Sequence, residues 1–422
     1  MIRKGERPIQ YGLIGEHLGH SFSKIVHAYL AEYDYELCEL TPDEVDAFMM
    51  RRDFCAINVT IPYKGKVIPH LSYIDPQAEA IGAVNTIVNR DGKLYGYNTD
   101  FYGMSALIRK LGIDPRGKKV AVLGTGGTSK TAMAVAQAMG AREILKVSRT
   151  AKDGAIDYAT LNAEHTDTEI VINTTPCGMY PNPDAAPICV RDFPSLEGVV
   201  DAIYNPLRPK LVLEAQAMGI PAEGGLYMLI AQAVRACEIF LDKTYPADTS
   251  DRIYRDILAQ KENIVLVGMP ACGKSTVGAI LSGTLKREVL DLDACIVKFA
   301  GKSIPEIFAE SGESGFRDLE TQVLEAELAQ RNGIVIATGG GAILRDRNVE
   351  ALRRNGRLYF IDRPLADLLP TEDRPLASSA EAIKKRFEER YHRYCAVADM
   401  RVEVRGTAES VAEAIRKDFF AQ

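Results

Sequence analysis

Residues 268–275 of this 422-residue chain, GMPACGKS, match the phosphate-binding loop pattern G-x-x-x-x-G-K-[ST] at every fixed position. The apolar run 263–267 before them predicts a buried strand, and a helix is predicted to follow. In that setting backbone N–H groups surround a phosphate at the helix N-terminus, so a chance glycine-rich turn is disfavoured. Lys274 is expected to neutralise the β- and γ-phosphates and Ser275 to bind Mg²⁺. The C-terminal third is therefore predicted to bind ATP through Gly268, Gly273, Lys274, Ser275 and Thr276.

Length and composition restrict the remaining possibilities. A chain of 422 residues is too long for one ordinary core, so two or three domains are expected. Apolar residues at 46% and charged residues at 26% are typical of a soluble globular protein, and the net charge of -6 argues against a nucleic-acid partner. The eight cysteines are scattered and favour free thiols in the cytoplasm. The sequence shows no signal-peptide core and no membrane-length apolar run, so no membrane partner is expected.

Predicted strands alternate with helices in residues 1–101, which indicates an α/β fold. The dipeptide Asp91-Gly92 between two apolar runs predicts a hairpin. Small polar side chains gather at the ends of predicted elements: Ser21, Ser23, Asn58, Thr60, Lys64, Asn85 and Asp100. Their types suit a small polyhydroxylated acid, with the lysine available for acid–base chemistry. Any one serine or asparagine is more often a cap or turn residue, so this chemistry alone leaves the substrate open.

Four motifs in order resemble those of shikimate dehydrogenases: Ser21-Phe-Ser23, 58–64 (NVTIPYK), 82–86 (GAVNT) and 98–100 (NTD). The resemblance implies that Lys64 and Asp100 form the catalytic pair. It also implies substrate contacts from Ser21, Ser23, Asn58, Thr60 and Asn85. Lys24 departs from the family, which usually has proline at this place, and adds a charge beside the two serines.

A second α/β unit follows. It begins with a predicted βαβ unit of about thirty residues, as a dinucleotide fold requires. The unit consists of strand 118–123, the glycine turn 124–127, a helix and strand 143–147. Gly124, Gly126 and Gly127 would lie against the cofactor, although the pattern alone also fits a plain strand–turn–helix. After the second strand come Ser148, Arg149 and Thr150. An NAD enzyme has at this place a carboxylate that binds the ribose 2′-hydroxyl. The arginine suits a 2′-phosphate and favours NADP(H), with a solvated loop charge as the alternative.

The resemblance to shikimate dehydrogenases continues to about residue 245. The family has an Asn-Arg-Thr motif where this chain has 148–150, and residues 173–179 resemble its N-x-T-P-x-G-M turn. The resemblance implies that Tyr204 and Gln232 contact substrate, whereas Gln232 alone would be interpreted as a packed helix residue. We expect a substrate-binding domain of residues 1–101 to which helices 225–245 return, a Rossmann NADP-binding domain of 102–224, and a linker of 246–261.

Beyond the phosphate loop, residues 288–293 predict a strand ending in two carboxylates, Asp291 and Asp293, on one side of the strand end. One would hold Mg²⁺ through water, and the other would accept a proton from a substrate hydroxyl. Arg317 opens a predicted helix, and residues 334–341 predict a strand ending in three glycines. Arg374 lies in a polar segment that could form a lid, and Arg390 lies in a helical run. Taken singly, these arginines would be ordinary surface residues.

The set D-x-D, F-R-x-x-E, G-G-G, R-P-L and R-x-x-x-Y resembles shikimate kinase, in order, across residues 262–422. The resemblance implies that shikimate binds to Asp293, Arg317, Gly340 and Arg390, and that Arg374 reaches the ATP phosphates. Arginine suits a carboxylate because its planar fork can bind both oxygens. This chain departs from the shikimate kinase family in three places. The segment 362–374 is short, an arginine that the family often uses near adenine is replaced around 369–370, and His392 stands where the family commonly has proline.

Together the two resemblances imply a cytoplasmic bifunctional α/β enzyme of aromatic amino acid biosynthesis, with NADP(H), ATP and Mg²⁺ as cofactors and a homodimer as a possible assembly. It would reduce 3-dehydroshikimate to shikimate and then phosphorylate shikimate to shikimate 3-phosphate. The residues expected to catalyse these steps are Lys64, Asp100, Lys274, Asp293 and Arg374. Two alternatives stay open: a dehydrogenase–kinase pair acting on a quinate-type acid, and a non-catalytic shikimate sensor. The presence of both Lys64 and Lys274 disfavours the sensor.

Overall fold

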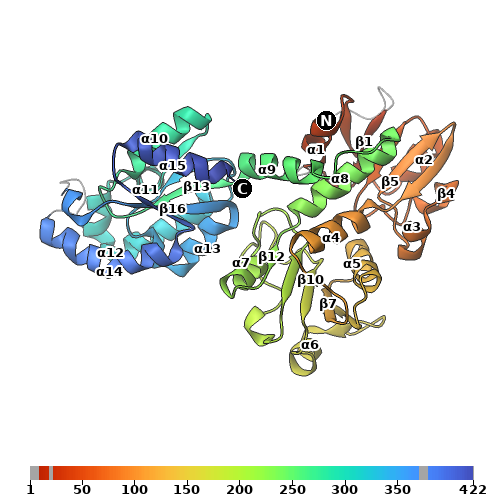
Figure 1. Cartoon of the computed structure of the whole chain (residues 1–422), viewed down its shortest axis with the longest axis horizontal. Helices are drawn as coiled ribbons and strands as arrows, with labels where there is room; N and C mark the ends of the chain where they lie inside the picture. The colour runs from red at the N-terminus through yellow and green to blue at the C-terminus, as the bar shows by residue number, and fades with distance from the viewer. Residues whose placement is uncertain (1–8, 19–21, 370–378, 422) are drawn as a thin grey trace. The chain divides into compact units, whose positions relative to one another are not determined.

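The computed structural model describes residues 9–18, 22–369 and 379–421. Its contacts divide the chain into two compact units, Met1–Tyr254 and Arg255–Gln422 (Figure 1). Both units are α/β, which confirms the predicted fold class. No helix in the described part of the chain is long and apolar enough to cross a membrane.

The first sheet of unit Met1–Tyr254 has the strand order β2-β1-β3-β5-β6-β4. Its strands are β1 (Tyr11–Gly15), β2 (Tyr35–Glu39), β3 (Ala56–Val59), β4 (Tyr73–Ile74), β5 (Thr86–Arg90) and β6 (Lys93–Tyr97). β5 and β6 pair antiparallel around Asp91 and Gly92, which confirms the predicted hairpin. Both turn residues have positive φ, 51° and 76°, as a tight turn between twisted strands requires.

The second sheet of this unit is parallel, with the order β12-β11-β10-β7-β8-β9. Its strands are β7 (Lys119–Leu123), β8 (Glu143–Ser148), β9 (Ile156–Asp157), β10 (Ile170–Asn173), β11 (Gly198–Asp201) and β12 (Ala222–Glu223). The helices that accompany it are α5 (Gly127–Ala138), α6 (Tyr158–Glu164) and α7 (Lys210–Ala217). Strand order reverses between β7 and β10, and such switch points open a ligand crevice at the carboxyl ends of the strands.

Helix α8 (Leu226–Leu241) returns to the first sheet after the second one is complete. It lies alongside α4 (Thr99–Lys110), as Figure 1 shows, and also contacts α1 (Ser23–Leu30) and β5. The two long helices approach closely because Gly103 has no side chain: a Cβ atom there would lie 2.5 Å from the Met228 carbonyl oxygen. The remaining helices of the first half are α2 (Glu44–Arg51) and α3 (Pro76–Ile81).

Unit Arg255–Gln422 is built on a parallel sheet of order β14-β15-β13-β16-β17. The strands are β13 (Asn263–Val267), β14 (Val289–Asp291), β15 (Val335–Ala337), β16 (Gly356–Asp362) and β17 (Met400–Glu403). The helices are α10 (Lys274–Leu285), α11 (Leu292–Ala300), α12 (Ile304–Val323), α13 (Asp346–Asn355), α14 (Ala380–Val397) and α15 (Ala408–Phe420). α9 (Thr249–Lys261) occupies most of the predicted linker.

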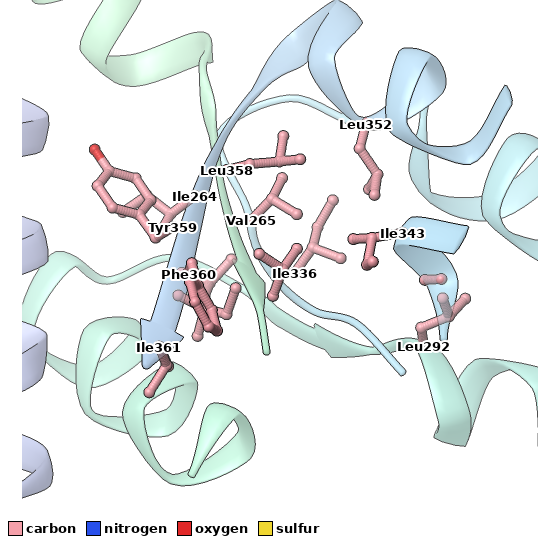
Figure 2. Close-up of a cluster of buried hydrophobic side chains, with 14 of the residues drawn as sticks. Ile264, Val265, Leu292, Ile336, Ile343, Leu352, Leu358, Tyr359, Phe360 and Ile361 are labelled. Atoms are coloured by element: carbon pink, nitrogen blue, oxygen red, sulfur yellow. The ribbon is translucent and has the colours of Figure 1, made fainter. Parts of the chain in front are cut away.

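The core of this unit surrounds β13, the central strand of the sheet, and its neighbour β16 (Figure 2). Leu358 and Tyr359 are completely buried although successive strand residues point to opposite faces, so both faces of the sheet are covered. The central strands are thereby held rigidly, and the loops at their carboxyl ends start from fixed positions. α12 is interrupted at Gly312, whose φ of 66° is not helical, so the segment after Gly312 takes its own direction.

Candidate active sites

Lys64 and Asp100 form the predicted pair. Lys64 lies in the loop after β3 and Asp100 in the first turn of α4, and Lys64 Nζ lies 2.6 Å from Asp100 Oδ2. The two side chains are only 13% and 5% exposed. A Cβ atom on Gly127 would lie 3.9 Å from Lys64 Cδ, so the lysine stem passes the start of α5. An ammonium group held in this way can donate a proton to a substrate lying between the two sheets.

Three predicted substrate residues are joined by hydrogen bonds. The Asn58 amide nitrogen donates to the Asn85 carbonyl oxygen at 3.2 Å, and Asn85 Nδ2 donates to Gln232 Oε1 on α8 at 3.2 Å. Thr60 follows the end of β3 and is partly buried, and Ser23 is the first residue of α1. Ser21 lies outside the described residues.

Tyr204 lies next to the start of α1. Its ring centroid is 5.3 Å from that of Phe22, the residue before α1, and burial raises the pKa of its phenol. The phenol therefore stays a neutral hydrogen-bond donor.

The glycine turn after β7 leaves room for a cofactor. Gly124 has φ of 114°, and a Cβ atom there would lie 2.6 Å from Thr174 Oγ1, so this position requires glycine. Beside Gly126, no other part of the described chain apart from its immediate neighbours lies within 4 Å of such a Cβ position. The space lies at the N-terminus of α5, where backbone N–H groups and the helix dipole favour a pyrophosphate. Ser129 stands where a G-x-G-x-x-G fingerprint has its third glycine, and its buried hydroxyl donates to the Gly124 carbonyl oxygen at 2.7 Å.

Residues 148–150 follow the end of β8. The Thr150 backbone N–H donates to Ser148 Oγ at 3.3 Å, which turns the chain, and the Arg149 side chain is exposed. Burial raises the pKa of Tyr158, the first residue of α6, and the positive charge of Arg149 opposes this rise. The exposed Arg149 guanidinium directly after β8 can pair with a phosphate.

Asp201 at the end of β11 is a functional candidate that the sequence reasoning missed. Its carboxylate accepts from Asn173 Nδ2 at 3.0 Å and from the Ile203 backbone N–H at 2.9 Å. Asn173 Oδ1 accepts in turn from the Thr175 N–H at 3.0 Å. The carboxylate thus orients the turn that packs against Gly124. An aspartate that ends a buried strand was the available signal.

Asp201 also predicts a pH-dependent stability. Burial raises its pKa from 3.8 to about 7, opposed by the bonds from Asn173 and Ile203. The folded protein holds a proton that the unfolded chain has lost between these two values, so stability falls as pH rises through this window. Asp201→Asn removes the buried charge, so its stability relative to the unchanged protein is expected to rise with pH, by up to about 1.4 kcal/mol per unit. Urea unfolding of both proteins from about pH 5 to about pH 8 measures this difference.

The exposed Asp192 supplies the control. An Asp192→Asn variant should follow the unchanged protein at every pH. A difference for Asp201→Asn that does not vary with pH would contradict the prediction.

In the second unit, Lys274 begins α10 and folds back over the phosphate loop. Its Nζ donates to the carbonyl oxygens of Gly268 and Met269, both at 2.9 Å, and the residue is 6% exposed. Gly268 and Gly273 have positive φ of 150° and 102°, which the loop's turn around an anion requires. Thr276 follows in the first turn of α10. The loop therefore holds a cation at the helix N-terminus, where a nucleotide phosphate is favoured.

The elements that carry Asp291 and Asp293 differ from the prediction. β14 ends at Asp291, which is the N-cap of α11, while Asp293 lies in the first turn of that helix. The prediction that both carboxylates lie on one side of a strand end is therefore wrong, because the Asp291 side chain accepts from the Asp293 N–H at 3.0 Å and starts a helix. Asp291 Oδ2 accepts from Ser275 Oγ at 2.9 Å. This hydroxyl and carboxylate are the hard oxygen ligands that Mg²⁺ prefers.

The predicted shikimate-binding arginines meet at the glycine loop after β15. Arg390 Nη1 donates to the Gly340 carbonyl oxygen at 3.2 Å. A Cβ atom on Gly341 would lie 2.2 Å from Arg317 Cζ, so that guanidinium lies directly against the loop. Arg317 Nη1 also donates to Glu320 Oε2 at 2.7 Å. The loop can approach both arginines because it carries no side chains.

Asp293 faces the same loop. A Cβ atom on Gly339 would lie 2.8 Å from Asp293 Oδ1 and 2.9 Å from Glu320 Oε1. Arg317 Nε and Glu320 Oε1 are buried and have no hydrogen-bond partner within the described part of the chain. Unpaired buried polar atoms are costly, so they are expected to bind a polar ligand here. Glu320 is a further residue that the sequence reasoning left without a role.

Arg363 is a second missed candidate. It follows β16, the neighbour of β13, and its Nε donates to the Cys272 carbonyl oxygen at 3.2 Å. Its Nη2 lies 3.6 Å from the position of a Cβ atom on Gly273. A cationic fork therefore lies beside the phosphate loop. The position of this arginine shortly after the apolar run 358–361 was the only available signal. Arg374, the predicted lid residue, lies outside the described residues.

Comparison with known proteins supplies families for both units. The shikimate kinase family model matches residues 270–419, and that of the shikimate dehydrogenase substrate binding domain matches residues 13–87. The shikimate dehydrogenase (NADP(+)) of Clostridium perfringens (strain SM101 / Type A) is 36% identical over 270 residues, which are 58% of this chain and 97% of that protein.

Two solved structures resemble the same part of the chain. Shikimate dehydrogenase 1 from Peptoclostridium difficile has a TM-score of 0.55 and 33% identity, covering 60% of this chain and 98% of its own. The shikimate 5-dehydrogenase from Thermus thermophilus in complex with NADP(H) and shikimate has a TM-score of 0.53 and 27% identity, covering 59% and 99%.

Proposed function

The chain belongs to the shikimate dehydrogenase family and carries a shikimate kinase domain behind it, and on this basis we propose that it catalyses two consecutive reactions. The first unit reduces 3-dehydroshikimate to shikimate with NADPH. The second transfers the γ-phosphoryl group of ATP to a hydroxyl of shikimate and yields shikimate 3-phosphate. One observation carries the proposal: the same chain holds the Lys64–Asp100 pair beside a dinucleotide turn, and a phosphate loop next to the glycine loop at which two arginines meet.

In the reduction, NADPH supplies the hydride when bound. Lys64 Nζ donates the proton that the developing alkoxide needs, and Asp100 keeps the ammonium group in place. The substrate is bound by polar side chains of the first unit, namely Asn58, Thr60, Asn85, Gln232, Tyr204, Ser21 and Ser23. When NADPH is bound, Gly124, Gly126 and Gly127 would hold its pyrophosphate, and Ser148, Arg149 and Thr150 would hold its 2′-phosphate.

In the phosphorylation, Mg²⁺ would be held by Ser275 and Asp291 and would neutralise phosphate charge. Lys274 leaves its carbonyl partners for the phosphate oxygens, which are stronger acceptors. Asp293 accepts the proton of the attacking hydroxyl, and Arg317, Arg390 and Gly340 hold the substrate carboxylate and ring. Gly268, Gly273 and Thr276 line the phosphate site, and Arg374 belongs to the catalytic set.

A two-stage assay on the purified full-length protein tests this function. The protein receives 3-dehydroshikimate and NADPH while NADPH loss is followed, and Mg-ATP is then added and shikimate 3-phosphate is measured. NADPH loss followed by formation of the phosphate ester is the expected result. Binding of shikimate without either reaction would favour a non-catalytic shikimate sensor. Turnover of quinate in preference to shikimate would favour a dehydrogenase–kinase pair that acts on a quinate-type acid.

Arg363 gives a prediction for the second stage. If its guanidinium contacts ATP phosphates, Arg363→Ala is expected to lower kcat/KM for ATP about 10-fold or more, because hydrogen bonds to charged groups are the strong ones. Steady-state kinetics with varied ATP at saturating shikimate measures the effect. Arg416→Ala, on α15 and paired with Glu413, is the matched control and should change nothing. Equal kinetics for Arg363→Ala and the unchanged protein would remove Arg363 from the site.

The domain arrangement is part of the proposal. We assign substrate binding in the first reaction to residues 1–101 with the returning helices 225–245, NADP binding to 102–224, the linker to 246–261 and the kinase to 262–422. The packing of α8 against α1 and α4 supports the return. The eight cysteines, none of them in a disulfide, support a cytoplasmic location. A homodimer is proposed as the assembly, and size-exclusion chromatography with light scattering tests it.

A further inference from the structure

The three amides of the reductase site have orientations that backbone groups determine. The Asn85 carbonyl oxygen can only accept, so the Asn58 nitrogen must face it, at 3.2 Å. The Thr99 N–H can only donate, so Asn85 Oδ1 must face it, at 2.7 Å. Asn85 Nδ2 is thereby directed at Gln232, whose Oε1 must be the acceptor. Neither asparagine can be turned over without losing a hydrogen bond to the backbone.

This arrangement makes Tyr35 the donor to Asn58. With its nitrogen committed to Asn85 and to Thr86 Oγ1, Asn58 directs Oδ1 at the Tyr35 hydroxyl, 2.7 Å away. Tyr35 is 3% exposed, and burial holds its pKa well above its usual value of 10.0. The ring stacks on His27 with centroids 3.9 Å apart. Burial lowers the pKa of His27 to about 3, opposed by its hydrogen bond with the Asn58 side chain. A neutral hydroxyl on a fixed ring therefore holds the amide oxygen.

We propose that Tyr35 is a positioning residue of the reductase: its hydrogen bond fixes the orientation in which Asn58 meets a substrate hydroxyl. The inference rests on the proposed function, because it needs Asn58 to contact substrate. Two donors of the same cluster complete the recognition of hydroxyl oxygens, namely the second hydrogen of Asn85 Nδ2 and the Gln232 amide nitrogen. The site thus presents one acceptor and two donors in fixed places, which suits a polyhydroxylated ring.

Tyr35→Phe tests the proposal, with Tyr33→Phe as its matched control. Tyr33 belongs to the same aromatic cluster, but its hydroxyl contacts His27 Nδ1 at 2.6 Å and Cys237 Sγ at 3.3 Å rather than an amide of the site. Tyr35→Phe is expected to raise KM for 3-dehydroshikimate about 3- to 10-fold, the loss of one hydrogen bond. kcat should stay nearly unchanged, because Asn58 binds substrate and transition state alike. Tyr33→Phe should leave KM within about 2-fold.

Phosphorylation by the same molecules reports the amount of full-length chain in every variant, and an unchanged kcat for reduction reports that the first unit is folded. Asn58→Ala should raise KM by itself, and adding Tyr35→Phe to it should have no further effect, because Tyr35 acts through Asn58. An unchanged KM in Asn58→Ala would contradict the proposed role of Asn58. Suppose that Asn58→Ala raises KM for 3-dehydroshikimate. An unchanged KM in Tyr35→Phe, or an equal rise of KM in Tyr33→Phe, would then overturn the inference about Tyr35 and leave the role of Asn58 intact.

Discussion

Replacing Lys64 with alanine is expected to lower kcat for reduction of 3-dehydroshikimate about 10²- to 10⁴-fold, the usual contribution of a positioned acid–base group. Lys64 Nζ is held by Asp100 at 2.6 Å and is 13% exposed, so no other side chain takes its place without rearrangement. The loss should appear in kcat more than in KM, because the proton is transferred in the transition state. Stopped-flow or steady-state measurement of NADPH oxidation detects it.

Lys66 provides the control. It lies two residues further along the same loop, 3.6 Å from Asp46 and 34% exposed, so Lys66→Ala changes the loop's charge equally without touching Asp100. Reduction by Lys66→Ala and phosphorylation by Lys64→Ala should both stay near normal. Retention of most of the reductase kcat in Lys64→Ala would contradict the assignment of Lys64 as the proton donor.

Replacing Lys274 with alanine is expected to lower kcat for phosphorylation about 10²- to 10³-fold, by analogy with the removal of one preorganised donor from a developing anion. Lys274 is the first residue of α10 and the buried cation of the loop. Its Nζ leaves two carbonyl oxygens at 2.9 Å for the phosphate oxygens of bound ATP, so binding of ATP should weaken as well. A coupled assay for ADP at saturating shikimate measures both effects.

Lys298 on α11 is exposed and serves as the control, so Lys298→Ala should phosphorylate normally. NADPH oxidation by Lys274→Ala should also be normal, which shows that the chain is intact. Simultaneous loss of both activities would indicate misfolding, and the variant with arginine at this position would then be measured instead. Undiminished phosphorylation by a folded Lys274→Ala would exclude the phosphate loop as the ATP site.

Several structural features followed from short stretches of sequence. The dipeptide Asp91-Gly92 predicted the hairpin because only residues that tolerate positive φ make so tight a turn. The glycines of residues 268–275 predicted the phosphate loop for the same reason. One short-range interpretation was wrong: Asp291 was placed on a strand together with Asp293, but an aspartate before a helical run is also an N-cap.

Other contacts required the folded chain. Asn85 and Gln232 are 147 residues apart in sequence yet bonded at 3.2 Å, and Arg363 meets Cys272 across 91 residues. No single sequence motif contains both members of either pair. The packing of α8 on α4 brings the first pair together, and the pairing of β16 with β13 brings the second pair together. Asp201 gains its raised pKa only when β11 is buried between its neighbours.

The sequence by itself determined both α/β units, both nucleotide-binding turns and the two enzyme families, because each depends on backbone conformations and spacings within a few residues. Tertiary structure alone decided which side chains complete the sites: Tyr35 behind Asn58, Asp201 behind Asn173 and Arg363 beside the phosphate loop. The physical reason is that a hydrogen bond or ion pair depends on the distance between atoms in space, and packing between distant elements sets that distance.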